Sequence, residues 1–205
     1  MSGNAGASGN AGASGSAGAG GSAGSPSAPA FTPVLRIDAR VHAARSGLSD
    51  ADFAEFLPEV NRIWLEQAGI CFEFLVVDTE ALGPRFDIWY EPGTSSDPNG
   101  YYSGDDEIWS RDRPNLGAAP EPVQFPAART TAHEFGHGLG LDHQDFGDAC
   151  PDGDGELDCN AFLMRSGRRG FFLSEPEIEA ARTVAARKAL ADRAPTACGE
   201  PVIDR

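Results

Sequence analysis

Three of the four histidines in this 205-residue chain fall within eleven consecutive residues. His133 and His137 are four residues apart, so on a helix their imidazoles leave the same face about one turn apart. His143 follows after Gly140, which has no Cβ and can therefore end the helix and turn the chain back. The spacing thus predicts a helix, a tight turn and a return segment that bring three imidazoles together.

Neutral imidazole nitrogens are common ligands of zinc, at about 2.0–2.1 Å. Three protein ligands leave one coordination position open, as in catalytic zinc sites and unlike closed structural ones. Glu134 stands beside the first histidine, where it can hold a water molecule without binding the metal itself. The sequence therefore predicts a Zn²⁺ site formed by His133, His137 and His143, with Glu134 as the general base.

The segment HEFGHGLGLDH, from His133 to His143, resembles the zinc signature of the metzincin metallopeptidases and is closest to the matrixin branch. The resemblance implies a zinc-dependent endopeptidase in which Glu134 takes a proton from water and passes it to the leaving amine. It also implies a methionine turn beneath the zinc, and Met164 is the match. The likeness is specific over residues 131–166 and only architectural over residues 34–130.

The chain departs from the matrixin pattern between the third histidine and the methionine, where residues 144–160 intervene. Ser166 also stands where some metzincin branches have a tyrosine. The resemblance places residues 165–172 in the wall of the pocket for the substrate side chain that follows the cleaved bond. If one of the three arginines of this segment faces the pocket, acidic side chains would be favoured. If one of its two phenylalanines lines the pocket instead, apolar side chains would be favoured.

Hydrophobic periodicity predicts an α/β fold. Apolar and polar residues alternate in the first expected strand, which is typical of a half-buried strand, and Pro58 predicts a kink or restart in the helix that follows. The metzincin resemblance implies an upper half with a twisted mixed sheet, a backing helix and the zinc-motif helix. It implies a small irregular lower half with the methionine turn and a C-terminal helix. We expect strands at 35–41, 70–77 and 86–90, a hairpin within 99–111, and helices at 49–69, at the histidine motif and at 174–192.

Composition changes sharply at about residue 30. Residues 1–30 carry no charge and contain a decaying six-residue repeat of Gly, Ala, Ser and Asn. Such a segment has too little apolar surface to offset the entropy lost on ordering. We therefore expect 1–30 to be a flexible tether and 31–205 to be the metallopeptidase catalytic domain. The tether lacks the basic start and apolar core of a signal peptide, as in a mature secreted protein.

The formal net charge of −15 argues against a nucleic-acid partner, which would need a basic surface. No apolar run reaches the roughly 20 residues of a transmembrane helix. We expect a monomer, secreted or tethered at the cell surface, that acts on protein or peptide substrates. The alternative is a surface binding or adhesion module whose zinc is structural or catalytically degenerate. Glu134, which a purely structural site would not need, favours the enzyme.

The four cysteines form no CxxC motif, which favours two disulfides and an oxidising compartment over four buried thiols. Cys150 and Cys159 flank a Gly- and Asp-rich loop, so we expect them to pair and to leave Cys71 with Cys198. Within this loop, residues 152–155 resemble part of an EF-hand, although the bidentate glutamate of such a loop is missing. The sequence allows two interpretations of this loop, a Ca²⁺ site and a solvated acidic loop.

Overall fold

A six-stranded sheet forms the centre of the molecule. The computed structural model describes residues 31–93, 98–112, 125–144, 161–166, 170–190 and 198–205. The strands are β1 (Leu35–His42), β2 (Ile70–Val77), β3 (Phe86–Glu91), β4 (Gly100–Gly104), β5 (Glu107–Arg111) and β6 (Val202–Asp204). They lie in the order β4-β5-β3-β1-β2-β6, and all neighbours are parallel except β4 and β5. The predicted α/β class is confirmed at this level.

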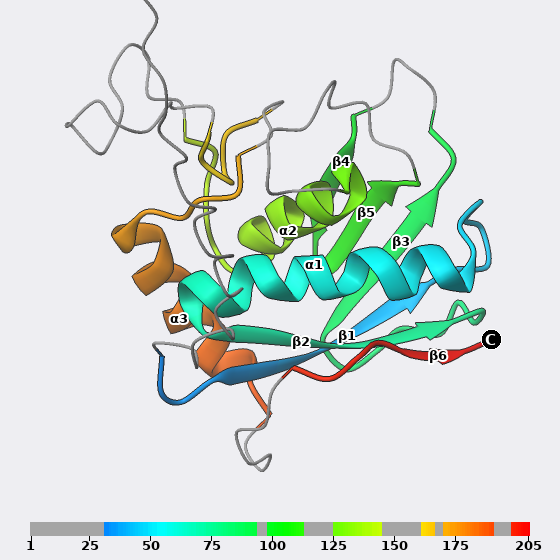
Figure 1. Ribbon diagram of the computed structural model, residues 1–205, viewed down its shortest axis with the longest axis horizontal. Helices are drawn as coiled ribbons and strands as arrows, with labels where there is room; N and C mark the ends of the chain where they lie inside the picture. Colours follow the sequence, from blue (N-terminus) through cyan, green and yellow to red (C-terminus); the bar gives the residue numbers. More distant parts are fainter. Residues whose placement is uncertain (1–30, 94–97, 113–124, 145–160, 167–169, 191–197) are drawn as a thin grey trace, which may run out of the picture.

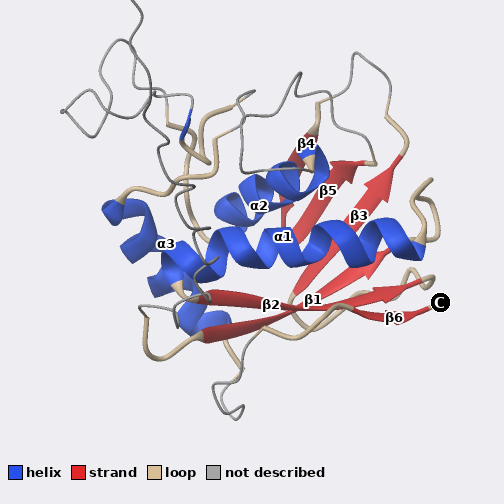
Figure 2. Cartoon of the chain, viewed as in Figure 1, coloured by secondary structure: helices blue, strands red, loops and turns tan. Residues whose placement is uncertain are grey.

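In the described part of the chain three helices pack against the sheet or its end, namely α1 (Asp50–Ala68), α2 (Pro126–Gly138) and α3 (Glu175–Lys188). Figure 1 shows α1 and α2 side by side on one face of the sheet, where α1 contacts β2 and α2 contacts β4 and β5. The third helix, α3, lies at one end of the sheet and contacts β1 and α1. In Figure 2 the helices α1 and α2 form one layer and the strands of the sheet form another. Within these layers β1, α1 and β2 form a parallel βαβ unit.

Helix α1 begins and ends at the residues that its sequence marks. The Ser49 hydroxyl accepts a hydrogen bond from the Asp52 backbone N–H at 3.3 Å, and the Asp52 carboxylate accepts one from the Ser49 N–H at 2.7 Å. Gly69 ends the helix in the left-handed conformation, with φ 60°. The helix does not restart at Pro58, because Leu57 beside it is fully buried and packing holds the turn despite the missing N–H.

The hydrophobic core lies between the sheet and the pair α1 and α2. Phe135 of α2 stacks on Phe72 of β2, with ring centroids 3.7 Å apart, and meets Phe86 of β3 edge-on at 5.0 Å. The Trp64 indole N–H of α1 donates to the Ala132 carbonyl of α2 at 3.1 Å. These contacts fix α2 against both of its neighbours, so the helix that carries two of the histidines is held by the core.

Strand β1 is more buried than the alternation of its sequence predicts. Arg36 and His42 on its polar face are both buried, the latter only 1 % exposed. The His42 ring stacks on Trp89 with centroids 3.8 Å apart. Its Nε2 lies 2.7 Å from Asp87 Oδ1 and its Nδ1 lies 2.6 Å from the Thr79 carbonyl. The reason is position, because β1 lies inside the sheet and side chains of its neighbours cover its outer face.

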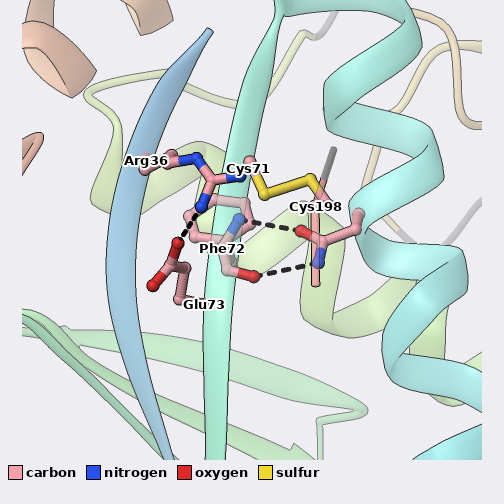
Figure 3. Close-up of a disulfide and its surroundings, with 6 residues drawn as sticks. Arg36, Cys71, Phe72, Glu73 and Cys198 are labelled. Atoms are coloured by element: carbon pink, nitrogen blue, oxygen red, sulfur yellow. Dashed lines mark hydrogen bonds and ion pairs between the residues drawn. A yellow bond between two sulfur atoms is a disulfide. The ribbon is translucent and has the colours of Figure 1, made fainter. Parts of the chain in front are cut away.

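A disulfide joins Cys71 of β2 to Cys198, with the two Cα atoms 5.7 Å apart (Figure 3). This pair was predicted from the cysteine positions and is confirmed. Beside it, Arg36 of β1 forms an ion pair with Glu73 of β2 (Figure 3). After Cys198 the chain adds β6 alongside β2, a strand that the sequence analysis did not predict. The disulfide thus places the C-terminal segment at the edge of the sheet.

Asn61 of α1 closes part of this sheet edge. Strand β6 pairs only with residues Leu75–Val77 of β2. Farther back along β2, the Phe72 N–H donates to Asn61 Oδ1 at 2.8 Å, and Asn61 Nδ2 donates to the Phe72 carbonyl at 2.9 Å. Asn61 is 4 % exposed. A buried side chain therefore satisfies both backbone groups that a neighbouring strand would otherwise take.

Helix α3 ends at Lys188, earlier than the predicted end near Asp192. The next residue is extended, and the Leu190 N–H donates to the Arg36 carbonyl at 2.9 Å, which draws the chain away from the helix axis toward β1. Among the described residues, no helix is long and apolar enough to cross a bilayer. The expected tether 1–30, the Cys150–Cys159 pair and the acidic loop 152–155 lie outside the described residues.

Candidate metal centre

Helix α2 carries the first two histidines of the motif. It begins at Pro126, a residue suited to the first turn because it lacks the N–H that would be left without a partner there. Its N-cap, Phe125, makes no side-chain capping bond. His133 and His137 follow one turn apart, with ring centroids 4.9 Å apart. The helix is thus placed by its packing rather than by a cap.

A tight turn after α2 brings the third histidine back. The Gly140 N–H donates to the His137 carbonyl and the Leu141 N–H donates to the Gly136 carbonyl, each at 2.9 Å. Gly140 has φ 83°, a left-handed conformation that glycine adopts without the cost of a Cβ. His143 Nε2 then lies 3.0 Å from the Nε2 atoms of both other histidines. The structure therefore brings together the three residues that the sequence predicted.

Hydrogen bonds to backbone carbonyls set the tautomer of two of these imidazoles. His133 Nδ1 lies 2.7 Å from the Leu163 carbonyl, and His137 Nδ1 lies 2.8 Å from the Leu141 carbonyl. A carbonyl oxygen only accepts, so each Nδ1 carries the proton and donates. Each Nε2 then presents a lone pair to the centre of the cluster.

The cluster fits a bound metal ion. The Nε2 atom of His143 lies 3.0 Å from the Nε2 atoms of His133 and His137, and lone pairs on nitrogens this close repel one another unless a cation lies between them. In a tetrahedral site with zinc–nitrogen bonds of about 2.0–2.1 Å, neighbouring ligand nitrogens would be about 3.3–3.4 Å apart. The ligand atoms of His133, His137 and His143 all lie within 4.8 Å of one another. The three histidines can hold one metal ion, and imidazole donors suit zinc, copper, iron and nickel.

Glu134 lies next to the cluster and is 5 % exposed. Burial raises the pKa of its carboxyl to about 7, although the charge of Arg129 and a hydrogen bond from the Tyr102 backbone act in the opposite direction. Burial, and after it the charge of Arg129, lowers the pKa of His133 to about 3. Burial also lowers the pKa of His137. The site therefore keeps these two imidazoles neutral at neutral pH, as metal ligands must be.

A cleft of about 730 Å³ opens onto the cluster. Strand β4, the edge strand of the sheet, forms one side of it, and α2 with the turn after it forms the other. Its lining includes Tyr101, Tyr102, Thr130, His133, Glu134, His137, His143 and Ser166. Both the histidines and the carboxyl group can therefore reach a molecule bound in this cleft.

Residues 161–166 form the floor beneath α2. The Met164 side chain is fully buried and lies so close to the helix that a Cβ on Gly136 would come within 2.2 Å of Met164 Sδ. The Leu163 N–H donates to the Phe172 carbonyl at 2.7 Å, which joins this segment to Phe172 farther along the chain. The methionine that the sequence analysis singled out therefore lies under the histidine helix, and a Cβ at position 136 would force its side chain to shift.

The described residues leave the nature of the substrate pocket a prediction. Residues 167–169, with two of the three arginines of the segment, lie outside the described part of the chain. Phe171 packs partly buried against the core, and Ser166 reaches the cleft. A preference for acidic and a preference for apolar substrate side chains therefore both stay predictions.

Sequence reasoning missed Arg129, which is buried in α2 one turn before His133. A signal was present, because Arg129, His133 and His137 are spaced by four residues and so share one helix face. An arginine on the same helix face as the buried His133 is too costly to bury without partners. The spacing could therefore have marked Arg129 as part of the site.

Comparison with known proteins supplies no relative, since no family model matches the chain and no curated protein matches it.

Proposed function

We propose that the protein is a zinc-dependent endopeptidase of the metzincin type. The observation that carries the proposal is the position of Glu134, a buried carboxyl beside three converging imidazole nitrogens, with all four groups open to one cleft. A site built only to hold a structural metal would need neither the carboxyl nor the cleft. Met164 beneath the helix supports the metzincin assignment.

In this proposal His133, His137 and His143 hold the metal through Nε2. When bound, a zinc ion supplies a Lewis acid that polarises the scissile carbonyl and makes water more acidic. Glu134 takes a proton from that water and delivers it to the nitrogen of the leaving amine. A carboxyl whose pKa is raised toward neutrality is suited to both steps, because it can bind and release a proton at physiological pH.

The substrate in this proposal is an extended peptide. The cleft runs beside β4, which has a sheet neighbour, β5, on only one side among the described strands. A peptide laid along such an edge can pair through its backbone, which would bring a scissile bond across α2. The Cys71–Cys198 disulfide is compatible with an extracellular location, where oxidising conditions preserve such bonds.

The decisive experiment compares casein or gelatin digestion by the wild type and by Glu134→Ala, with metal content measured on both. We expect one Zn²⁺ per chain in each protein, and an activity about 10²–10⁴-fold lower in the variant, because a general base is lost and no ligand is. Glu55→Ala, an exposed glutamate of α1, serves as the matched control and should leave activity unchanged.

Two outcomes would contradict the proposal. Residual activity of Glu134→Ala within about tenfold of the wild type would mean that another group is the base. A wild type that binds zinc stoichiometrically yet cleaves neither protein would support the structural-zinc module instead. Abolition of cleavage by o-phenanthroline would confirm the dependence on metal.

A further inference from the structure

Among the described residues near the histidine cluster, Arg129 is the most deeply buried cation, at 3 % exposure. Among the described residues, its hydrogen-bond acceptors are backbone carbonyls of the floor segment and of the chain that returns from it. Its Nε donates to the Gly170 carbonyl at 3.1 Å, and its Nη2 donates to the carbonyls of Leu163 at 2.6 Å and Arg165 at 2.8 Å. One side chain of α2 thus holds three points of the floor.

The Leu163 carbonyl is shared between Arg129 and a metal ligand. It accepts a hydrogen bond from Arg129 Nη2 and another, at 2.7 Å, from His133 Nδ1. A carbonyl oxygen has two lone pairs and can accept both. The second bond sets the tautomer and the ring orientation of His133. The position of the Leu163 oxygen therefore determines where His133 Nε2 points, and Arg129 holds that oxygen in place.

The charge of Arg129 does not explain its presence. A positive charge one turn from His133 repels a metal cation bound there. A buried guanidinium is also costly in itself. What arginine supplies that an apolar residue cannot is a rigid fork of donors matched to several carbonyls.

We propose that Arg129 is a positioning residue of the metal centre, which orients His133 by fixing the Leu163 carbonyl to which His133 donates. The inference rests on the metal site of the proposed function and does not depend on peptide hydrolysis. Groups that orient metal ligands in this way typically contribute about 10–100-fold to metal affinity.

The test measures Zn²⁺ affinity by competition with a chelator in the full-length protein. Arg129→Met keeps an unbranched apolar stem and removes the guanidinium with its donors and charge. Arg182→Met is the matched control, because Arg182 also donates to two backbone carbonyls, those of Ala68 at 2.6 Å and Pro33 at 3.2 Å, but away from the histidines. Urea unfolding with chelator present reports the stability of each variant without metal.

We expect Arg129→Met to bind Zn²⁺ about 10–100-fold more weakly than the wild type. The visible spectrum of its Co²⁺ form, which reports ligand geometry, should change as well. Arg129→Lys, which keeps one donor group, should recover part of the affinity. Arg182→Met should keep both the affinity and the spectrum of the wild type, even where its loss of stability equals that of Arg129→Met.

Unchanged or tighter Zn²⁺ binding by Arg129→Met, with an unchanged Co²⁺ spectrum, would overturn the inference and leave the proposed peptidase intact. A wild type that binds no metal would instead contradict the proposed function. If Arg129→Met does not fold, Arg129→Lys decides the question, since wild-type affinity together with a wild-type spectrum in that variant would overturn the inference.

Discussion

Helices α1 and α2 lie next to each other, yet they are specified in different ways. Helix α1 has nineteen residues, a capping box and a glycine end, and it buries one apolar face that includes no ionisable residue. Helix α2 has thirteen residues and no side-chain cap, and eleven of its residues are buried. Three of these are Arg129, His133 and Glu134. The difference teaches that α1 is defined by its own sequence, whereas α2 is defined by what surrounds it.

Replacing one buried phenylalanine in each helix should distinguish the roles of the two helices most clearly. Phe135→Ala in α2 and Phe53→Ala in α1 each remove a fully buried ring, and each should lower the free energy of unfolding by about 3–5 kcal/mol. Only Phe135→Ala should also weaken Zn²⁺ binding, because its ring fixes α2 against Phe72 and Phe86. Urea unfolding and chelator competition measure the two effects. Equal loss of Zn²⁺ affinity in both variants would remove the distinction.

Gly136→Ala should have an intermediate effect. In an exposed helix this change would stabilise by about 1 kcal/mol. Here the new Cβ would lie 2.2 Å from Met164 Sδ and 2.9 Å from its Cε, so the methionine must move. The free energy of unfolding should therefore fall by about 1–3 kcal/mol. Thermal or urea unfolding gives the sign.

The double variant Gly136→Ala/Met164→Ala serves as the control for this contact. It should lose less stability than the sum of the single changes, because removing the thioether makes room for the new methyl group. A stabilising Gly136→Ala, or strictly additive single changes, would show that the helix and its floor are not in contact.

Ser49→Ala should have the smallest effect and should be confined to stability. It removes the cap of α1 and should lower the free energy of unfolding by about 1 kcal/mol. Ser49→Thr keeps a capping hydroxyl and is the control. Zn²⁺ affinity should not change in either variant, and a measurable loss of it in Ser49→Ala would mean that α1 takes part in shaping the metal centre.

The same contrast explains what could be predicted from the sequence. The ends of α1 follow from Ser49 and Gly69, since capping is local. The meeting of His133, His137 and His143 follows from spacing along one helix and one turn. Local patterns of this kind need no knowledge of the rest of the fold, and both of these are present in the structure, whereas the restart considered at Pro58 is not.

Several features that depend on contacts between distant segments were not predicted, although the Cys71–Cys198 disulfide was. Strand β6 has only three residues and exists because β2 offers an edge beside the Cys71–Cys198 disulfide. The role of Arg129 depends on carbonyls of Leu163 and Arg165, more than thirty residues away in the chain. The burial of His42 likewise depends on side chains of β3. Apart from the four-residue spacing between Arg129 and His133, none of these features leaves a periodic signal near the residue concerned.

Asn61 has a consequence for how the protein behaves in concentrated solution. An open sheet edge is a template on which a second chain can add a strand, and repeated addition leads to aggregation. Asn61 occupies the Phe72 backbone groups with its own amide, and it does so from α1. Resistance to self-association through this edge therefore lasts only while α1 stays docked, so undocking of α1 is the step that would expose the protein to polymerisation.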